Sequence, residues 1–172
     1  MPQVILTGFM ATGKSEVGRR LARRLERPFV DVDGLVEAAA GRSVKDIFAS
    51  EGEAAFRALE RDAVARACEV AGAVIATGGG TLLDPENRRR LAAAGPIVCL
   101  AASPEEILRR VGDASSRPLL ANGTRPEDRL SRIRSLLLER ASAYAVATHQ
   151  VDTSGLTPDE VVARVEALVK GR

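Results

Sequence analysis

The 172-residue sequence predicts an α/β fold in which a parallel sheet is covered by helices. The first observation behind this is that short apolar runs alternate with longer segments of helical period. The second is that a glycine-containing segment follows the first apolar run and leads directly into a helical pattern. Because a chain of this length is enough for one hydrophobic core, we expect a single domain over residues 1–172.

Each expected element follows from its local pattern. The expected strands are the apolar runs at 4–6, 29–32, 74–76, 97–100 and around Val151. The expected helices are the segments at 14–26, 34–40, 53–71, 86–94, 104–111, 125–145 and 157–170. Ser103-Pro104 and Thr157-Pro158 mark two helix starts. Between 112 and 124 the sequence GDASSRPLLANGT breaks both periods, and we expect an irregular excursion there.

Composition excludes several classes of protein. Aromatic residues make up 3% of the chain and the net charge is +2, which argues against a nucleic-acid binder that stacks bases. No run approaches the roughly 20 apolar residues of a membrane span, and no charged leader precedes the first apolar run, so we expect a cytoplasmic protein. His149 is the only histidine, which excludes a histidine triad or zinc cluster. Cys68 and Cys99 have apolar neighbours and are expected to be reduced, structural thiols.

The segment from Gly8 to Ser15, GFMATGKS, matches the phosphate-loop pattern G-x-x-x-x-G-K-[ST] in full. Its place between a buried strand and an amphipathic helix is the place that the mechanism needs, because the helix N-terminus and the loop N–H groups attract phosphate. We expect Lys14, one of only three lysines, to reach the β- and γ-phosphates of ATP and Ser15 to ligate Mg²⁺. A strand-to-helix turn without a ligand is the alternative.

Two carboxylates follow the second expected strand. Asp31 and Asp33 occupy alternate positions near its carboxyl end, so they are expected to point in opposite directions, one towards metal and phosphates and the other towards an acceptor hydroxyl. Phosphoryl transfer needs a carboxylate that orients or deprotonates its nucleophile. The alternatives are that the carboxylates are solvated at the end of the strand, or that Asp33 caps the following helix.

Further along, Arg57 and Glu60 share a helix face, and the spacing by itself is that of an ordinary exposed ion pair. Residues 78–80 are three consecutive glycines, which permit a ligand to approach the backbone closely. Arg117 lies in the irregular excursion, where it is able to cover a transferring phosphoryl group, and Arg140 lies on a long helix and suits a carboxylate. Because almost all of the 25 basic residues are arginine, spacing alone does not select these two.

These motifs together resemble the shikimate kinases over essentially the whole chain. The family pattern GFM-x-x-GKS, D-x-D, F-R-x-x-E, GGG, RPLL and R-x-x-x-Y is present in order. The resemblance implies an α/β P-loop fold with a five-stranded parallel sheet, like that of nucleoside monophosphate kinases, with a substrate-binding segment at about 33–61 and a lid at about 112–124. It implies an enzyme that uses ATP and Mg²⁺ to phosphorylate the 3-hydroxyl of shikimate, in the pathway to aromatic amino acids. A monomer is the default expectation for the oligomeric state.

The resemblance also implies roles for single residues. Asp33 is the expected base, Lys14 and Arg117 are expected to stabilise the transferring charge, and Asp31 is expected to support Mg²⁺ together with Ser15. The expected shikimate contacts are Asp33, Arg57, Glu60, Gly79, Gly80 and Arg140, with Val44, Phe48 and Phe56 as an apolar wall. The expected ATP contacts are Ala11, Thr12, Gly13, Lys14, Ser15, Glu16, Arg110 and Arg117. Arg110 is expected against the adenine, with further adenine contacts around 153–158.

One departure and two alternatives accompany this reading. Ala11 stands where the family commonly has glycine, which affects the shape of the loop. Another small-molecule kinase, such as a gluconate kinase, explains the phosphate loop equally well. A nucleotide-dependent binding module with nucleic acid on the arginine-rich first helix is a different class, although glutamates dilute that face and a solvated surface is the simpler interpretation.

Overall fold

The computed structural model describes residues 1–112 and 125–171, and its centre is the five-stranded parallel sheet that the sequence predicts. The strands are β1 (Val4–Gly8), β2 (Phe29–Asp31), β3 (Val74–Ala76), β4 (Ile97–Ala101) and β5 (His149–Asp152). Their order across the sheet is β2-β3-β1-β4-β5, and each neighbouring pair is parallel. Since parallel neighbours need crossover connections, helices cover both faces of the sheet.

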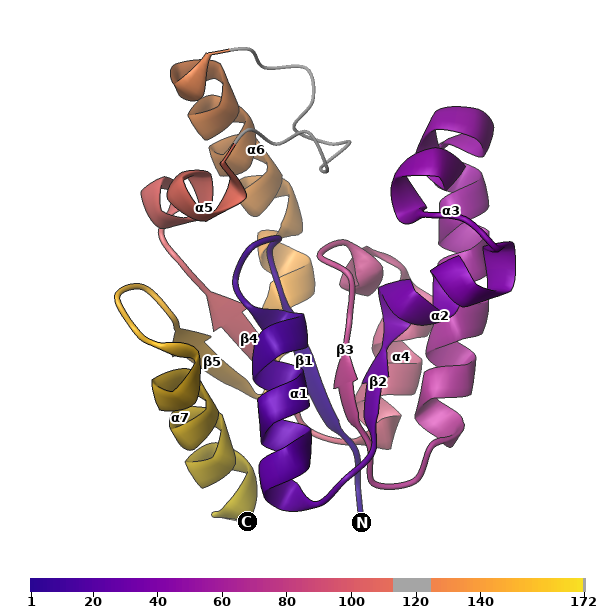
Figure 1. Ribbon diagram of the computed structural model, residues 1–172, viewed down its shortest axis with the longest axis vertical. Coiled ribbons are helices and arrows are strands. Elements are labelled where there is room, and N and C mark those ends of the chain that lie inside the picture. The colour runs from indigo at the N-terminus through magenta and orange to yellow at the C-terminus, as the bar shows by residue number, and fades with distance from the viewer. Residues whose placement is uncertain (113–124, 172) are drawn as a thin grey trace.

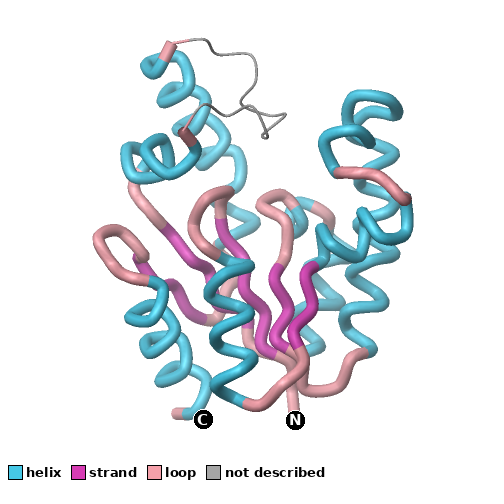
Figure 2. Tube along the Cα trace, in the orientation of Figure 1, coloured by secondary structure: helices cyan, strands magenta, loops and turns pink. Residues whose placement is uncertain are grey.

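The helices form a layer on each side of the strands (Figures 1 and 2). They are α1 (Lys14–Leu25), α2 (Val32–Ala40), α3 (Val44–Glu69), α4 (Pro85–Ala94), α5 (Pro104–Val111), α6 (Pro126–Tyr144) and α7 (Pro158–Lys170), with a short 3₁₀ helix, η1, at Thr81–Leu83. Helices α1 and α7 pack on one face, and α3 and α4 pack on the other. The described residues therefore form a three-layer α/β structure.

Side-chain alternation along β1 explains the two cores. Val4 and Leu6 pack with α1 and α7, whereas Ile5, between them, packs with α3 and α4. All three side chains are buried, because a central parallel strand is covered on both faces. A smaller cluster joins Phe9 of the phosphate loop to Ile107 of α5 and to α6. This third cluster anchors the loop to the helices that follow β4.

The carboxyl ends of the strands lie along one edge of the sheet, at the top in Figure 1, where α2 and α3 rise on one side and α5 and α6 on the other. The phosphate loop after β1, the start of α2 after β2 and the glycines after β3 are all at this edge. Both chain termini lie at the opposite edge (Figure 1). The parallel topology thus gathers segments that are far apart in the sequence.

Two predicted boundaries were wrong. Strand β2 ends at Asp31 and α2 begins at Val32, so Asp33 lies in the first turn of a helix and not on a strand. The expected strand-like alternation of Asp31 and Asp33 is therefore incorrect. The physical reason is that Asp31 is the N-cap residue of α2 and has an extended backbone, so the chain changes from strand to helix directly after it.

The second wrong boundary concerns α3, which begins at Val44 rather than at residue 53. Ser43 caps it by accepting a hydrogen bond from the Asp46 N–H. Gly52 has a backbone φ of 82°, which interrupts the helix. Glycine adopts this conformation readily and also breaks the helical period in the sequence, so the sequence pattern does not predict the part of α3 that precedes Gly52.

The described residues contain no helix that is both long enough and apolar enough to cross a membrane. The arginines of α1 take part in contacts within the protein: Arg20 donates to Glu16 and to Asp159, and Arg24 pairs with Glu166 of α7. The contacts with Asp159 and Glu166 join α1 to α7, and all three pairs neutralise part of that positive face.

Candidate active site

The phosphate loop has the shape that its glycines permit. The backbone φ is positive at Gly8, Ala11 and Gly13. A Cβ atom at Gly8 would lie 2.1 Å from the carbonyl oxygen of Leu100, so a larger residue does not fit there. The hydroxyl of Thr12 donates to the carbonyl oxygen of Phe9 at 2.7 Å and closes the turn. The loop is therefore held in a compact form by its own contacts.

Lys14 and Ser15 begin α1 directly after this loop. The Lys14 ammonium donates to the carbonyl oxygen of Phe9 at 2.7 Å and so lies across the loop. The Ser15 hydroxyl donates to Oδ2 of Asp31 at 2.7 Å. Glu16 is exposed and accepts from Arg20. The first turn of α1 thus places an ammonium group across the loop and a hydroxyl against the carboxylate of Asp31 at the end of β2.

Ser15 and Asp31 fit Mg²⁺ by their chemistry, since hydroxyl and carboxylate oxygens are the hard donors that this ion prefers. Among residues 1–112 and 125–171 there is no group of three or more histidine, cysteine, aspartate or glutamate side chains placed to hold a metal. A pair of protein oxygens suits an ion whose remaining positions are filled by phosphate and water.

Asp33 projects from the first turn of α2 and is the most perturbed carboxylate of the site. Its Oδ1 atom is buried and has no hydrogen-bond partner among the described residues. Burial, followed by the negative charges of Asp31 and Glu60, raises its pKa to about 6, while Lys14 opposes the shift. Such a group changes protonation state close to neutral pH, which is what a general base needs.

Glu60 corrects the interpretation of an ordinary exposed ion pair. Its residue exposure is 0%, and it accepts from Arg57 Nη1 at 2.8 Å and from the Thr81 hydroxyl at 2.7 Å. The Arg57 guanidinium also donates to Glu53 and lies 5.1 Å from the centre of the Phe56 ring. Glu60 is therefore fully buried and Arg57 partly buried, and the contacts with Thr81 of η1 and with Glu53 fix the orientation of the pair.

The three glycines lie between β3 and η1, against charged side chains. A Cβ atom at Gly80 would lie 2.5 Å from Nη2 of Arg57, and one at Gly79 would lie 3.1 Å from Nη1 of Arg140. The Tyr144 hydroxyl donates to the carbonyl oxygen of Gly79 at 2.6 Å. The missing side chains therefore make room for the two arginines, and Tyr144 holds the loop in place.

Arg140 is a nearly fully buried cation, with a residue exposure of 3%. Its Nη1 atom has no hydrogen-bond partner among the described residues, and its guanidinium lies 5.3 Å from the centre of the Phe9 ring. A buried and incompletely paired guanidinium is costly unless an anion binds to it. Arg140 is thus placed to receive a carboxylate.

One cavity of about 410 Å³ brings these groups together. It lies between α2, α3, the glycine loop and α6, and the apolar side chains of Val44, Phe48 and Phe56 form part of its wall. Its lining also includes Asp33, Arg57, Glu60, Gly79, Gly80 and Arg140. We call it the acceptor cavity.

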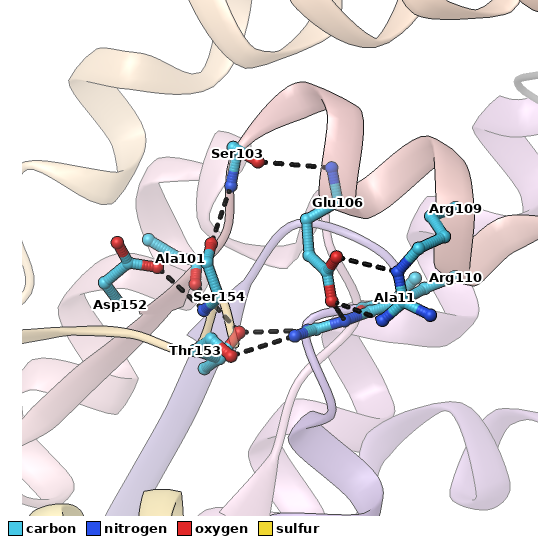
Figure 3. Close-up of polar contacts among 9 residues, drawn as sticks. All are labelled: Ala11, Ala101, Ser103, Glu106, Arg109, Arg110, Asp152, Thr153 and Ser154. Atoms are coloured by element: carbon cyan, nitrogen blue, oxygen red, sulfur yellow. Dashed lines mark hydrogen bonds and ion pairs between the residues drawn. The ribbon is translucent and has the colours of Figure 1, made fainter. Parts of the chain in front are cut away.

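A second cavity of about 470 Å³ lies on the other side of the phosphate loop. Its lining includes Ala11, Thr12, Gly13, Glu16, Arg110 and residues 155–158. Figure 3 shows that Arg110, at the end of α5, reaches towards the carbonyl of Ala11 and towards Thr153 after β5. We call it the nucleotide cavity.

The structure brings most of the predicted site residues into these two groups. Lys14, Ser15 and Asp31 lie at the loop and line neither cavity. Arg117 lies outside the described residues. Sequence reasoning did not single out Met10, Glu37, Ser43 and Lys45 of the acceptor cavity, nor Thr81, which binds Glu60. The position of Thr81 next to the glycines was a usable signal for that residue, whereas nothing in the local pattern marks Glu37 or Lys45.

A phosphate loop that separates a nucleotide cavity from a cavity with buried cations and a carboxylate defines a P-loop kinase with a small, acidic acceptor. Comparison with known proteins narrows this class. A sequence model of the family described as shikimate kinase matches residues 10–170.

Individual relatives agree with that match over the full length of the chain. A shikimate kinase of Caldanaerobacter subterraneus is 46% identical over all of this chain and all of its own length. One of Pelotomaculum thermopropionicum is 43% identical over 99% of this chain and 96% of its own. The solved structure of the Acinetobacter baumannii shikimate kinase in complex with shikimate has a TM-score of 0.93 and 32% identity, covering 99% of this chain and 94% of that one. The chain belongs to the shikimate kinase family.

Proposed function

We propose that this protein transfers the γ-phosphoryl group of ATP to the 3-hydroxyl of shikimate, giving shikimate 3-phosphate and ADP, in the pathway to aromatic amino acids. The observation that carries the proposal is the acceptor cavity, where Oδ1 of Asp33 and Nη1 of Arg140 are buried and lack hydrogen-bond partners among the described residues. Family membership supports the same activity.

The acceptor cavity suits a small ring acid with hydroxyl groups. Arg57 and Arg140 are proposed to bind the carboxylate, since guanidinium groups bind carboxylates in two-point contacts. Gly79 and Gly80 line the same region without side chains of their own, and Glu60 fixes the orientation of Arg57. These contacts are proposed to place the reacting hydroxyl beside Asp33.

The chemistry follows from the charges around the phosphate loop. Asp33 is proposed to accept a hydrogen bond from the acceptor hydroxyl and to take its proton as the hydroxyl oxygen attacks phosphorus in line with the departing ADP. Lys14 neutralises the charge of the phosphates. Mg²⁺ would be held by Ser15 directly and by Asp31 through water, and when bound it would neutralise phosphate charge. Arg117 is proposed to stabilise the same charge from the lid segment.

The domain extent, the acceptor-binding segment, the lid, the oligomeric state and the location are also proposals. We propose one domain over residues 1–172, with residues 33–61 as the acceptor-binding segment; this range contains α2 and the kink at Gly52. A lid at 112–124 is proposed from the resemblance, and 113–124 lie outside the described residues. A monomeric state and a cytoplasmic location are predictions from the sequence.

A coupled ADP-release assay tests the proposed function. Wild-type protein with MgATP should turn over shikimate. Gluconate, which is acyclic, and quinate, whose ring is saturated, should react poorly, because their hydroxyls are placed differently relative to the carboxylate. Lys14→Ala should abolish the reaction, because phosphate charge is no longer neutralised. Lys170→Ala, at the end of α7, serves as the matched lysine control. Preferential turnover of gluconate, or turnover of none of the acids, would contradict the proposal.

A further inference from the structure

Thr153 follows β5 directly and forms part of the lining of the nucleotide cavity. Its residue exposure is 2%. Its N–H donates to the carbonyl oxygen of Ala101 at 2.8 Å, and its hydroxyl donates to the same oxygen at 2.9 Å. Since a hydroxyl has one proton, this contact leaves only the oxygen lone pairs of Thr153 for any other partner.

That other partner is the guanidinium of Arg110 (Figure 3). Arg110 Nη1 donates to the Thr153 hydroxyl oxygen at 3.0 Å, and Arg110 Nη2 donates to the Thr153 carbonyl oxygen at 2.9 Å. Thr153 therefore binds two nitrogens of one guanidinium, which sets the plane of that group. The chain of contacts runs from the carbonyl of Ala101 in β4 through Thr153 to the end of α5.

The other donors of Arg110 are also bound within the protein. Its Nε donates to Glu106 at 2.7 Å, and its Nη1 donates to the carbonyl oxygen of Ala11 at 3.2 Å. Four of these contacts use four of the five N–H donors of the group. Because four of the five donors on the edge of the guanidinium are used, its flat face is the main surface that remains for a ligand. A flat cation suits the π face of a nucleotide base.

We propose that Thr153 is a positioning residue for the nucleotide. It orients the face of Arg110 towards the base, and through Arg110 it holds the carbonyl of Ala11 in the phosphate loop. This inference rests on the proposed function, because it takes the second cavity as the nucleotide site. The hydroxyl proton of Thr153 is taken by the carbonyl oxygen of Ala101, so Thr153 acts through Arg110 rather than by donating to the ligand.

The chain offers a matched control at the opposite end of the same strand pair. The N–H and the hydroxyl of Thr148 both donate to the carbonyl oxygen of Ile97 at 2.8 Å. These are the contacts that Thr153 makes with Ala101, but without an arginine and away from both cavities. Thr148→Val therefore removes an equivalent threonine-to-carbonyl bond, although at a more exposed residue.

The test is the dissociation constant of ADP, measured by calorimetry with full-length protein in the absence of any acceptor. Thr153→Val should weaken ADP binding about tenfold, since Arg110 loses an acceptor and the loop loses its support. Thr153→Ser keeps the hydroxyl and should restore binding to within about twofold of the wild type. Thr148→Val should bind ADP as the wild type does. The shikimate KM should be unchanged in all three variants.

A double-mutant cycle separates positioning from general loosening of the fold. If Thr153 acts through Arg110, then Thr153→Val should have no further effect on ADP affinity in an Arg110→Met background. Additive losses in the double mutant would overturn the proposal, and so would equal losses in Thr153→Val and Thr148→Val. Should Thr153→Val fail to fold, Thr153→Ala is placed in the same cycle and judged by the same outcomes.

The two proposals fail in different ways. A wild-type protein that does not bind ADP contradicts the proposed function and, with it, this inference. A wild-type protein that binds ADP with the affinity of Thr153→Val contradicts the role of Thr153 alone.

Discussion

The acceptor cavity and the nucleotide cavity differ in whether their charged side chains are paired by hydrogen bonds within the protein. In the acceptor cavity, Asp33 and Arg140 keep buried polar atoms without partners among the described residues. In the nucleotide cavity, Arg110 is bound by Glu106, Thr153 and the carbonyl of Ala11. The difference predicts that the acceptor supplies the missing partners in the acceptor cavity, whereas Arg110 is already paired and offers a ligand mainly its flat face.

The largest expected effect comes from Asp33, the acceptor-side group that reacts. Asp33→Asn should lower kcat by at least about 100-fold, because the amide does not accept the hydroxyl proton. The affinity for ADP should hardly change, since Asp33 does not line the nucleotide cavity. Steady-state kinetics with shikimate and calorimetry with ADP measure the two effects. Asp62→Asn, an exposed aspartate of α3, is the control.

The pH dependence of activity and of stability, compared between the wild type and Asp33→Asn, tests the raised pKa of Asp33. Because the pKa of Asp33 is raised to about 6, kcat/KM for shikimate should rise with pH through that value in the wild type. A raised pKa means that the stability contributed by the neutral carboxyl is present below its ordinary value of 3.8 and is lost as the pH rises through about 6. Asp33→Asn should therefore be more stable than the wild type at pH 8, by about 1–3 kcal/mol, and similar to it at pH 3.5. Equal stability at both pH values would show that burial does not strain this carboxylate.

Arg140→Met is expected to have the next largest effect. It should raise the KM for shikimate about 10- to 100-fold, in line with about 1.5–3 kcal/mol for a lost charged hydrogen bond. Shikimate should also raise the melting temperature of the wild type more than that of this variant, because the variant keeps only Arg57 of the two arginines proposed to bind the carboxylate. Arg134→Met, on the exposed face of α6, is the matched control. An unchanged KM in Arg140→Met would move the carboxylate site elsewhere.

The smallest expected effect lies on the nucleotide side. Ala11 has a backbone φ of 60°, in the left-handed region that costs a non-glycine residue about 1 kcal/mol. Ala11→Gly should relieve this cost and raise the melting temperature by about 2–4 °C. Glu26→Gly at the end of α1, where φ is 54°, should give a similar rise without touching a cavity. A lower melting temperature in Ala11→Gly alone would mean that contacts of the alanine outweigh its backbone strain.

Prediction from the sequence worked where the signal is local. The phosphate loop was found because glycine, lysine and serine at fixed spacing follow a buried strand, and the strands were found because apolar runs alternate with helical periods. It failed at the start of α2 and in the first turns of α3, where a cap residue or Gly52 interrupts the period within a few residues. The exposed interpretation of Arg57 and Glu60 failed because helical spacing does not report what covers that face of the helix.

What the sequence alone determined is the fold class, the phosphate loop and the order of the motifs, because each depends on residues close together in the chain. What only the tertiary structure decided is which charged groups are buried, paired or left open. Glu60 is bound by Thr81, 21 residues away, and Arg110 by Thr153, 43 residues away. Burial and pairing of this kind arise when parallel strands bring distant loops to one edge of the sheet. They cause the raised pKa of Asp33 and leave Nη1 of Arg140 without a hydrogen-bond partner among the described residues.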